Sequence, residues 1–214
     1  MARIKHKRTQ HRKGKKTYSI IVDGKTEVWY LQMLKENEDI PRIDIKPELP
    51  KKKKLSEQFG SVLENSKVYD EVIWLIDLDT ILKETREAKS GSKTALQELR
   101  EYKSKIDKNI ETQNVEIFVN SPCLELWLLL HFESIGKFYS KCTDVEKRLR
   151  KSYLTNYKKS EKFYKKRGND IYNLLSNRKQ IAIENSKKLG EFDIENPNKS
   201  ISEMYKIFKK FGIT

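Results

Sequence analysis

The chain has 214 residues, enough for one α/β domain with an appendage and for a sizeable core. Its 45 Lys and Arg outnumber its 31 Asp and Glu, and the charge of +14 indicates an anionic partner such as nucleic acid or a membrane surface. Apolar runs such as 126–130 are far too short to span a bilayer, and no apolar segment follows the basic N-terminus as in a signal peptide. We therefore expect a cytoplasmic protein that is not inserted in a membrane.

The first sixteen residues form a strongly basic segment, with eight Lys or Arg and no acid. Such a segment is either a solvated tail or an arm that lies along a phosphate backbone. We treat 1–16 as a basic N-terminal arm that precedes the folded part of the chain.

Residues 17–135 alternate between strand and helix patterns. Short β-branched or apolar runs predict strands at 18–22, 43–46, 71–76 and 115–119. Helices are expected at 26–37, 55–66, 92–110 and 122–133. This alternation predicts an α/β fold in which a parallel sheet is covered by helices on both faces, with ligands bound at the carboxyl ends of the strands.

Residues 136–214 read as a basic, largely helical region. Between 137 and 191 there are 16 Lys or Arg and only 6 acids. Tyr153, Tyr157 and Tyr164 could stack on unpaired bases, although tyrosines spaced along helices are more often packing residues. The basic residues that we expect to contact nucleic acid are Lys25, Arg148, Arg150, Lys158, Lys159, Lys165, Lys166 and Arg167.

The two cysteines, Cys123 and Cys142, lie far apart in the sequence without a Cys-x-x-Cys motif, and there are only three histidines. These counts argue against a disulfide framework and against a structural zinc site. We therefore expect reduced thiols, with Cys123 as a small core residue and His131 as a packed histidine rather than a ligand.

The turn Gly24-Lys25-Thr26, which follows the first predicted strand, has the last three residues of a phosphate-binding loop. A Walker loop needs a further glycine five positions earlier, but that position is Ser19, inside the strand. Asp23 would also place its charge against a phosphate. The turn therefore needs another explanation.

Acidic residues follow two of the predicted strands. Asp77 and Asp79 end the apolar run 71–76, and residues two apart in a strand point to the same side. Asp23 and Glu27 lie just past the first strand. If these strands are adjacent and parallel, the four carboxylates converge and need a hard cation such as Mg²⁺ or Mn²⁺. The alternative is a solvated loop in which Glu27 simply favours a helix start.

The segment 120–132 is apolar except for Glu125 and the residues at its ends. Pro122 suits the first helical position, with Ser121 as the N-cap. Glu125 either faces the acidic crevice as a catalytic residue or orients a basic residue there. The alternatives are a surface acid favoured by the helix dipole and a structural ion pair.

The acidic turn, the Asp-x-Asp strand end and the 120–132 block together resemble the RloB-like family, whose genes lie beside restriction and abortive-infection systems in bacteria. The likeness spans nearly the whole chain. It implies a Toprim-like (Rossmann-like) core, similar to that of topoisomerases and primases, whose acidic residues serve a metal-dependent nuclease. Two positions depart from the family pattern: Asp23 replaces a glutamate, and Ser121 is inserted before Pro122.

Two functions are compatible with these patterns. In the first, the chain is a Mg²⁺- or Mn²⁺-dependent nuclease of antiviral defence that cuts DNA or RNA, tRNA included. Asp77 and Asp79 would then hold the metal, Asp23 would act as a ligand or general acid or base, and Glu27 as a ligand or orienting group. In the second, the shorter Asp23 leaves a site without activity, and the chain binds nucleic acid or docks to an ATPase partner.

Overall fold

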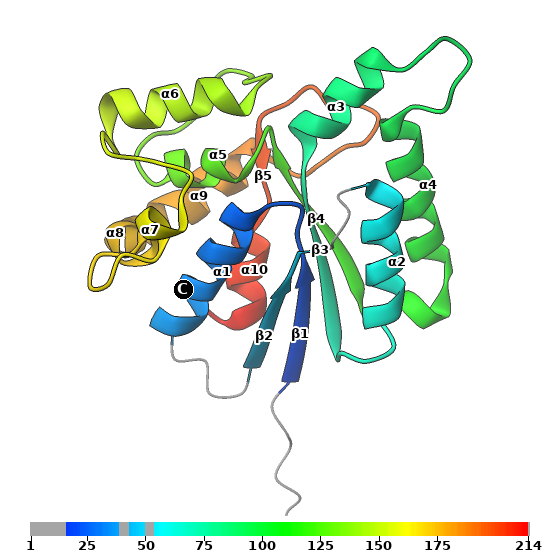
Figure 1. The fold of residues 1–214 in the computed structure, drawn as a ribbon, viewed down its shortest axis with the longest axis horizontal. Helices are drawn as coiled ribbons and strands as arrows, with labels where there is room; N and C mark the ends of the chain where they lie inside the picture. The colour runs from blue at the N-terminus through cyan, green and yellow to red at the C-terminus, as the bar shows by residue number, and fades with distance from the viewer. Residues whose placement is uncertain (1–15, 39–42, 50–53, 214) are drawn as a thin grey trace, which may run out of the picture.

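A computed structural model describes residues 16–38, 43–49 and 54–213, which build a five-stranded sheet with helices on both faces (Figure 1). The strand order is β2-β1-β3-β4-β5; the first four are parallel and β5 is antiparallel to β4. This confirms the predicted Rossmann-like α/β fold, with one unpredicted antiparallel edge strand of two residues. The strands are β1 (Lys16–Ile21), β2 (Ile43–Glu48), β3 (Glu71–Asp77), β4 (Val115–Ser121) and β5 (Ile201–Ser202).

The sheet separates two hydrophobic clusters, one on each face. Strand β3 contributes to both because its side chains alternate between the faces. Trp74 and Ile76 face one hydrophobic cluster, and Ile73 and Leu75 face the other. The first cluster is covered by α2 (Leu55–Asn65), α3 (Leu78–Glu87) and α4 (Ala95–Lys108). The second is covered by α1 (Lys25–Asn37), α5 (Leu124–Leu130) and α10 (Met204–Phe211), together with the helices between α5 and α10.

The C-terminal region shares the second cluster rather than building its own. Tyr157 and Phe208 belong to the same buried cluster as Tyr18 of β1. The chain then returns to the sheet, where Ser202 pairs with Asn120. The remaining helices are α6 (Cys142–Ser152), α7 (Glu161–Tyr164), α8 (Ile171–Leu175) and α9 (Lys179–Leu189), with 3₁₀ turns η1 (Ile110–Thr112) and η2 (Ser176–Arg178).

The predicted arm 1–16 lies outside the described residues except for Lys16. That lysine begins β1, and its Nζ lies 2.7 Å from a carboxylate oxygen of Glu71. Within the described ranges, no helix is long and apolar enough to cross a membrane.

The junction between β4 and α5 differs from the prediction. Ser121 is the last residue of β4 rather than an N-cap, because it pairs with Ile201 of β5. The Ser121–Pro122 peptide is cis, and Cys123 is the N-cap of a helix that begins at Leu124. Glu125 is therefore the second helical residue, not the fourth.

Candidate active site

The carboxyl ends of β1 and β3 bring the predicted acidic residues together. These strands are neighbours and parallel, with Ile21 opposite Trp74. Asp23 follows β1, Glu27 lies in the first turn of α1, and Asp77 ends β3. One carboxylate oxygen from each of the three lies within 4.8 Å of the others. They line a cavity of about 490 Å³.

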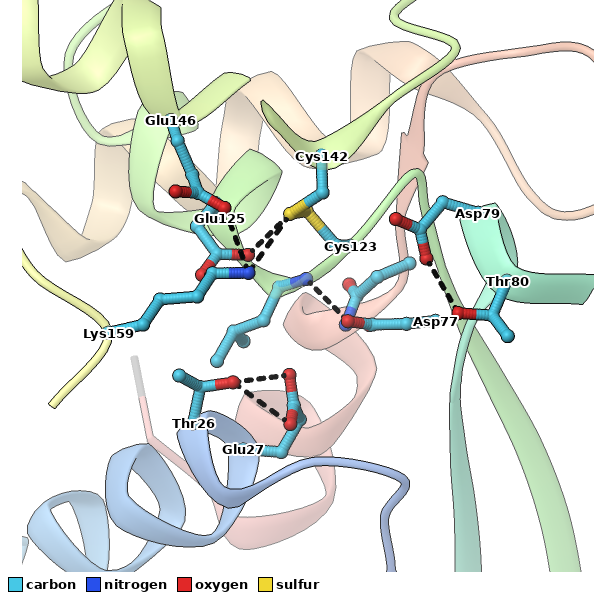
Figure 2. Close-up of a disulfide and its surroundings, with 12 residues drawn as sticks. Thr26, Glu27, Asp77, Asp79, Thr80, Cys123, Glu125, Cys142, Glu146 and Lys159 are labelled. Carbon is cyan, nitrogen blue, oxygen red and sulfur yellow. Dashed lines mark hydrogen bonds and ion pairs between the residues drawn. A yellow bond between two sulfur atoms is a disulfide. The ribbon is translucent and has the colours of Figure 1, made fainter. Parts of the chain in front are cut away.

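Gly24 is needed by Glu27, not by a phosphate. A Cβ built on Gly24 would lie 2.2 Å from Oε2 of Glu27, so a larger residue would push that carboxylate away. The φ of Gly24 is −135°, which any residue can adopt. Thr26 donates a hydrogen bond from Oγ1 to the same carboxylate at 3.1 Å (Figure 2). The turn that resembles a phosphate loop therefore holds the Glu27 carboxylate close to its own backbone at Gly24.

Asp77 is held by β4 and α5. The backbone N–H of Leu124 donates to its Oδ2 at 3.2 Å, and the Asn120 amide donates to its Oδ1 at 3.4 Å. Ser202 in turn donates from Oγ to Oδ1 of Asn120 at 2.8 Å. The short strand β5 therefore orients the amide that orients Asp77. Asn120 was not predicted as a site residue, although its place near the end of a parallel strand is where ligands collect.

The negative charges of these carboxylates repel one another. Burial raises the pKa of Asp77 well above its usual range, and the charges of Glu27 and Asp23 raise it further. Burial also raises the pKa of Glu27, and the charge of Glu125 adds to this rise. Among the residues that the structure describes, no Lys or Arg forms an ion pair with Glu27 or Asp77. Closely spaced carboxylate oxygens, two of them on groups whose pKa is raised, form a donor set that suits Mg²⁺ or Mn²⁺.

Asp79 does not lie where the sequence placed it. Strand β3 ends at Asp77 and α3 begins at Leu78, so the two-residue period of a strand no longer applies at Asp79. Its backbone N–H donates to the carbonyl of Pro122, and its carboxylate accepts a bond of 3.4 Å from Thr80 Oγ1. Asp79 lines the same cavity but is outside the group of three, in which Glu27 stands in its place.

Glu125 has a cation of its own. It is fully buried, accepts a hydrogen bond of 2.5 Å from Tyr157, and lies 3.0 Å from the ammonium of Lys159. Lys159 also lies 3.0 Å from Glu146. Burial lowers the pKa of Lys159, but the two carboxylates outweigh this effect and raise it overall, so the ammonium stays charged. Glu125 thus forms an ion pair that holds a basic residue in the wall of the cavity (Figure 2).

The cysteines contradict the expectation of reduced thiols. Cys123 and Cys142 form a disulfide, although 19 positions separate them in the sequence. The fold brings them together because Cys123 precedes α5 and Cys142 opens α6, which packs on α5. Both residues line the cavity. Cysteine counts and spacings contain no information about this contact, which depends on how two helices pack.

The predicted basic residues divide into two sets. Arg148 pairs with Glu133, Arg150 with Glu146, and Lys165 with Glu161, as Lys159 does with Glu125 and Glu146. The other four have no ion pair with any residue that the structure describes, and all four are exposed: Lys25, Lys158, Lys166 and Arg167.

The tyrosines of the C-terminal region mainly pack. Tyr157 and Tyr164 are fully buried and hydrogen-bonded to each other through their hydroxyls, so they cannot stack on bases. Tyr153 stacks on Phe132. Among the described residues, the aromatic side chain that does line the cavity belongs to Trp29, which was not predicted as a site residue.

A family model described as RloB-like protein matches residues 18–211. The chain belongs to the RloB-like family. The match spans the acidic turn, the 120–132 block and the C-terminal helices, which confirms the resemblance. No curated protein and no solved structure matches the chain significantly.

Proposed function

We propose that this RloB-like protein is a metal-dependent nuclease of prokaryotic antiviral defence that hydrolyses phosphodiester bonds in DNA or RNA. The observation that carries the proposal is the group of Asp23, Glu27 and Asp77, whose oxygens converge within 4.8 Å in a cavity of about 490 Å³. The net charge of +14 supports a polyanionic substrate.

The three carboxylates would hold Mg²⁺ or Mn²⁺, which when bound polarises a phosphate oxygen and lowers the pKa of a coordinated water. The chain's own contribution is to fix the ligands before the substrate arrives. Leu124 and Asn120 orient Asp77, and Thr26 together with Gly24 sets the position of Glu27. Asp79, at the cavity but outside the group, is the candidate to accept a proton from the attacking water.

Phosphate contacts would come from the exposed cations that form no ion pair with a described acid. Lys25 lines the cavity itself, and Lys158, Lys166 and Arg167 lie on the C-terminal region. Such contacts give affinity without sequence readout, so we expect binding to weaken steeply with added salt. Arg148, Arg150 and Lys165 contribute less because each already has an acidic partner.

The second candidate is a non-catalytic module that binds nucleic acid or docks to an ATPase partner. The observation in its favour is Asp23, which is one methylene shorter than the glutamate of the family pattern. A shorter side chain at this position leaves a group that binds a cation without placing it for hydrolysis. In that case the same cavity would bind a metal ion and nucleic acid but would not cleave the nucleic acid.

The test is cleavage of plasmid, single-stranded DNA, messenger RNA and total tRNA with Mg²⁺ or Mn²⁺. Asp77→Asn removes one ligand charge while keeping the side-chain shape. Asp107→Asn is the matched control, because Asp107 lies near the end of α4, which leads to the start of β4 at the opposite end of the sheet. We expect cleavage that EDTA and Asp77→Asn abolish and Asp107→Asn keeps.

Cleavage that persists in EDTA and in Asp77→Asn would contradict the proposed site. Binding that is sensitive to salt, with no cleavage of any substrate, would favour the binding module.

A further inference from the structure

A disulfide forms part of the cavity wall. Cys123 and Cys142 both line the space that the carboxylates face, and the chain has no other cysteines. Disulfides of intracellular proteins are usually redox-active rather than structural. The two cysteines are only 2% and 6% exposed, so a small thiol would reach the sulfurs through this cavity.

The disulfide is connected to the ion pair at the cavity. Sγ of Cys142 lies 2.9 Å from Oε2 of Glu125 and 3.3 Å from Nζ of Lys159 (Figure 2). A disulfide sulfur has no proton to donate and is a weak acceptor. Among the described residues, the Lys159 ammonium therefore makes its strong contacts with Glu125 and Glu146, and an anion in the cavity would compete only with the weak contact to Sγ of Cys142.

Reduction would change both partners of Lys159. A reduced Cys142 has an S–H that can donate to Oε2 of Glu125 across the same 2.9 Å, and this bond would weaken the attraction of the carboxylate for Lys159, which lies on Oε1. Cys142 also opens α6, which carries Glu146 one turn later. Without the disulfide, the start of α6 is no longer tied to Cys123, so both carboxylates that hold Lys159 lose part of their positioning.

We propose that Cys123–Cys142 is a thiol–disulfide exchange site that controls the position of Lys159 in the cavity. A dithiol reductant attacks one Sγ, which forms a mixed disulfide and releases the other Sγ as a thiolate that takes up a proton. The second thiol of the reductant then displaces the first Sγ. The protein gains two electrons and two protons, and the reductant becomes a disulfide. The nearby Lys159 ammonium stabilises the thiolate that leaves.

Metal binding is a weaker explanation of the same residues. Cys123, Glu125 and Cys142 have ligand atoms close enough to surround a metal ion. However, the ammonium of Lys159 already lies beside two of these three groups and would repel a cation there. In addition, the two sulfurs are bonded to each other and carry no charge to offer.

Thiol–disulfide exchange is tested on the full chain in buffers of oxidised and reduced glutathione or of oxidised and reduced dithiothreitol. Alkylation followed by mass spectrometry counts the free thiols, and hydrogen exchange follows α6. We expect zero free thiols in oxidising buffer, two in reducing buffer, full reversibility, and faster exchange over 142–152 after reduction. Exchange over 95–108 in α4 should stay unchanged.

The effect of the disulfide on nucleic-acid affinity rests on the proposed function and is measured separately. A labelled single-stranded oligonucleotide is titrated in EDTA, where no cleavage occurs. We expect the oxidised protein to bind about threefold to tenfold more tightly, the scale of one weakened charged hydrogen bond. Lys159→Met should bind weakly in both redox states. Lys188→Met, an exposed lysine of α9, should keep the redox difference.

Two results would contradict a thiol–disulfide exchange site: thiols that stay free in oxidising buffer, or equal hydrogen exchange of α6 in the two redox states. If hydrogen exchange of α6 changes on reduction but the affinity for the oligonucleotide does not, the disulfide does not control binding through Lys159. Stoichiometric zinc binding by the reduced protein, lost in Cys142→Ser, would replace the proposal with a metal site. If no oligonucleotide binds in either state, the nucleic-acid function fails, while the thiol counts and hydrogen exchange still decide the exchange site.

Discussion

Two sets of carboxylates lie close to the cavity and differ in how their charge is compensated: Glu27 and Asp77 line it, whereas Glu125 is buried behind Lys159 in its wall. Glu125 has Lys159 at 3.0 Å and a tyrosine hydroxyl at 2.5 Å, so its charge is compensated within the protein. Glu27 and Asp77 have hydrogen bonds but no ion pair with a described Lys or Arg, and burial and mutual repulsion raise their pKa values. A buried charge with a partner contributes to structure, whereas one without a partner is maintained at a cost to stability and marks a binding site.

The largest expected effect comes from breaking the compensated group. Lys159→Met leaves the buried Glu125 charge without its cation. Removing one partner of a buried ion pair typically costs 3–5 kcal/mol, and we expect about 2 kcal/mol here because the Lys159 side chain is 40% exposed. Urea unfolding measures the loss. Lys159→Met/Glu125→Gln should recover most of it, and an additive double variant would show that the two residues are not coupled.

For the uncompensated Asp77, removing the charge should stabilise the protein rather than destabilise it. The raised pKa of Asp77 means that the folded protein holds its proton more tightly than the unfolded chain, so stability falls as pH rises above the ordinary aspartate range. Asp77→Asn removes this penalty, and we expect it to stabilise the metal-free protein by about 1–2 kcal/mol at pH 7.

The same pair of proteins tests for the cation without any measurement of activity. Mg²⁺ or Mn²⁺ should raise the Tm of the wild type, since a ligand that binds only the folded state stabilises it. The Tm of Asp77→Asn should not respond. Asparagine keeps only one acceptor for the two donors on Asp77, so the comparison is made across pH in EDTA. If the stability of the variant relative to the wild type does not rise with pH, Asp77 is compensated after all.

A third buried group, His131, is held neutral. It is 1% exposed, and its Nδ1 lies 2.9 Å from the carbonyl of Trp127. Burial lowers the pKa of His131 from 6.5 to about 4. The unfolded chain therefore binds more protons between these values, and stability falls as pH is lowered from 6.5 toward 4.

The loss from His131 should reach about 1 kcal/mol at pH 5.5. His131→Gln should flatten this part of the stability–pH curve, as measured by urea unfolding. An unchanged slope in the variant would assign the acid sensitivity to other groups.

Much of the fold was predictable because it depends on local patterns. The four parallel strands and the first helices follow from apolar periodicity, and the convergence of Asp23, Glu27 and Asp77 follows from parallel strand order. Strand β5 was not predictable, since two residues carry no period. The place of Asp79 was missed because β3 ends at Asp77 and α3 begins at Leu78, so Asp79 lies in a helix and the two-residue period of a strand does not apply to it.

What the sequence could not provide are contacts between distant segments. Lys159 was predicted as one of eight basic residues, but nothing in its neighbourhood distinguishes it from Lys158. Only the packing of α6 and the 153–160 segment against α5 places it beside Glu125. The Cys123–Cys142 disulfide depends on the same packing.

The smallest effect on stability should come from Gly24→Ala, which sharpens the comparison at the level of one atom. The new Cβ would meet Oε2 of Glu27 at 2.2 Å, and that oxygen ends a flexible side chain that can swing away. We expect a change of less than about 0.5 kcal/mol in the free energy of unfolding, as for a surface substitution. The affinity for Mn²⁺, measured by calorimetry, should fall about tenfold because the displaced Glu27 carboxylate no longer lies beside the other ligands.

Gly60→Ala is the matched control for this variant. Gly60 lies inside α2, and a Cβ there would meet nothing within 4 Å. It should stabilise the protein slightly through helix propensity and leave Mn²⁺ affinity unchanged. If Gly24→Ala binds Mn²⁺ as tightly as Gly60→Ala does, then Glu27 is not a ligand, and Asp79 returns as the third carboxylate of the site.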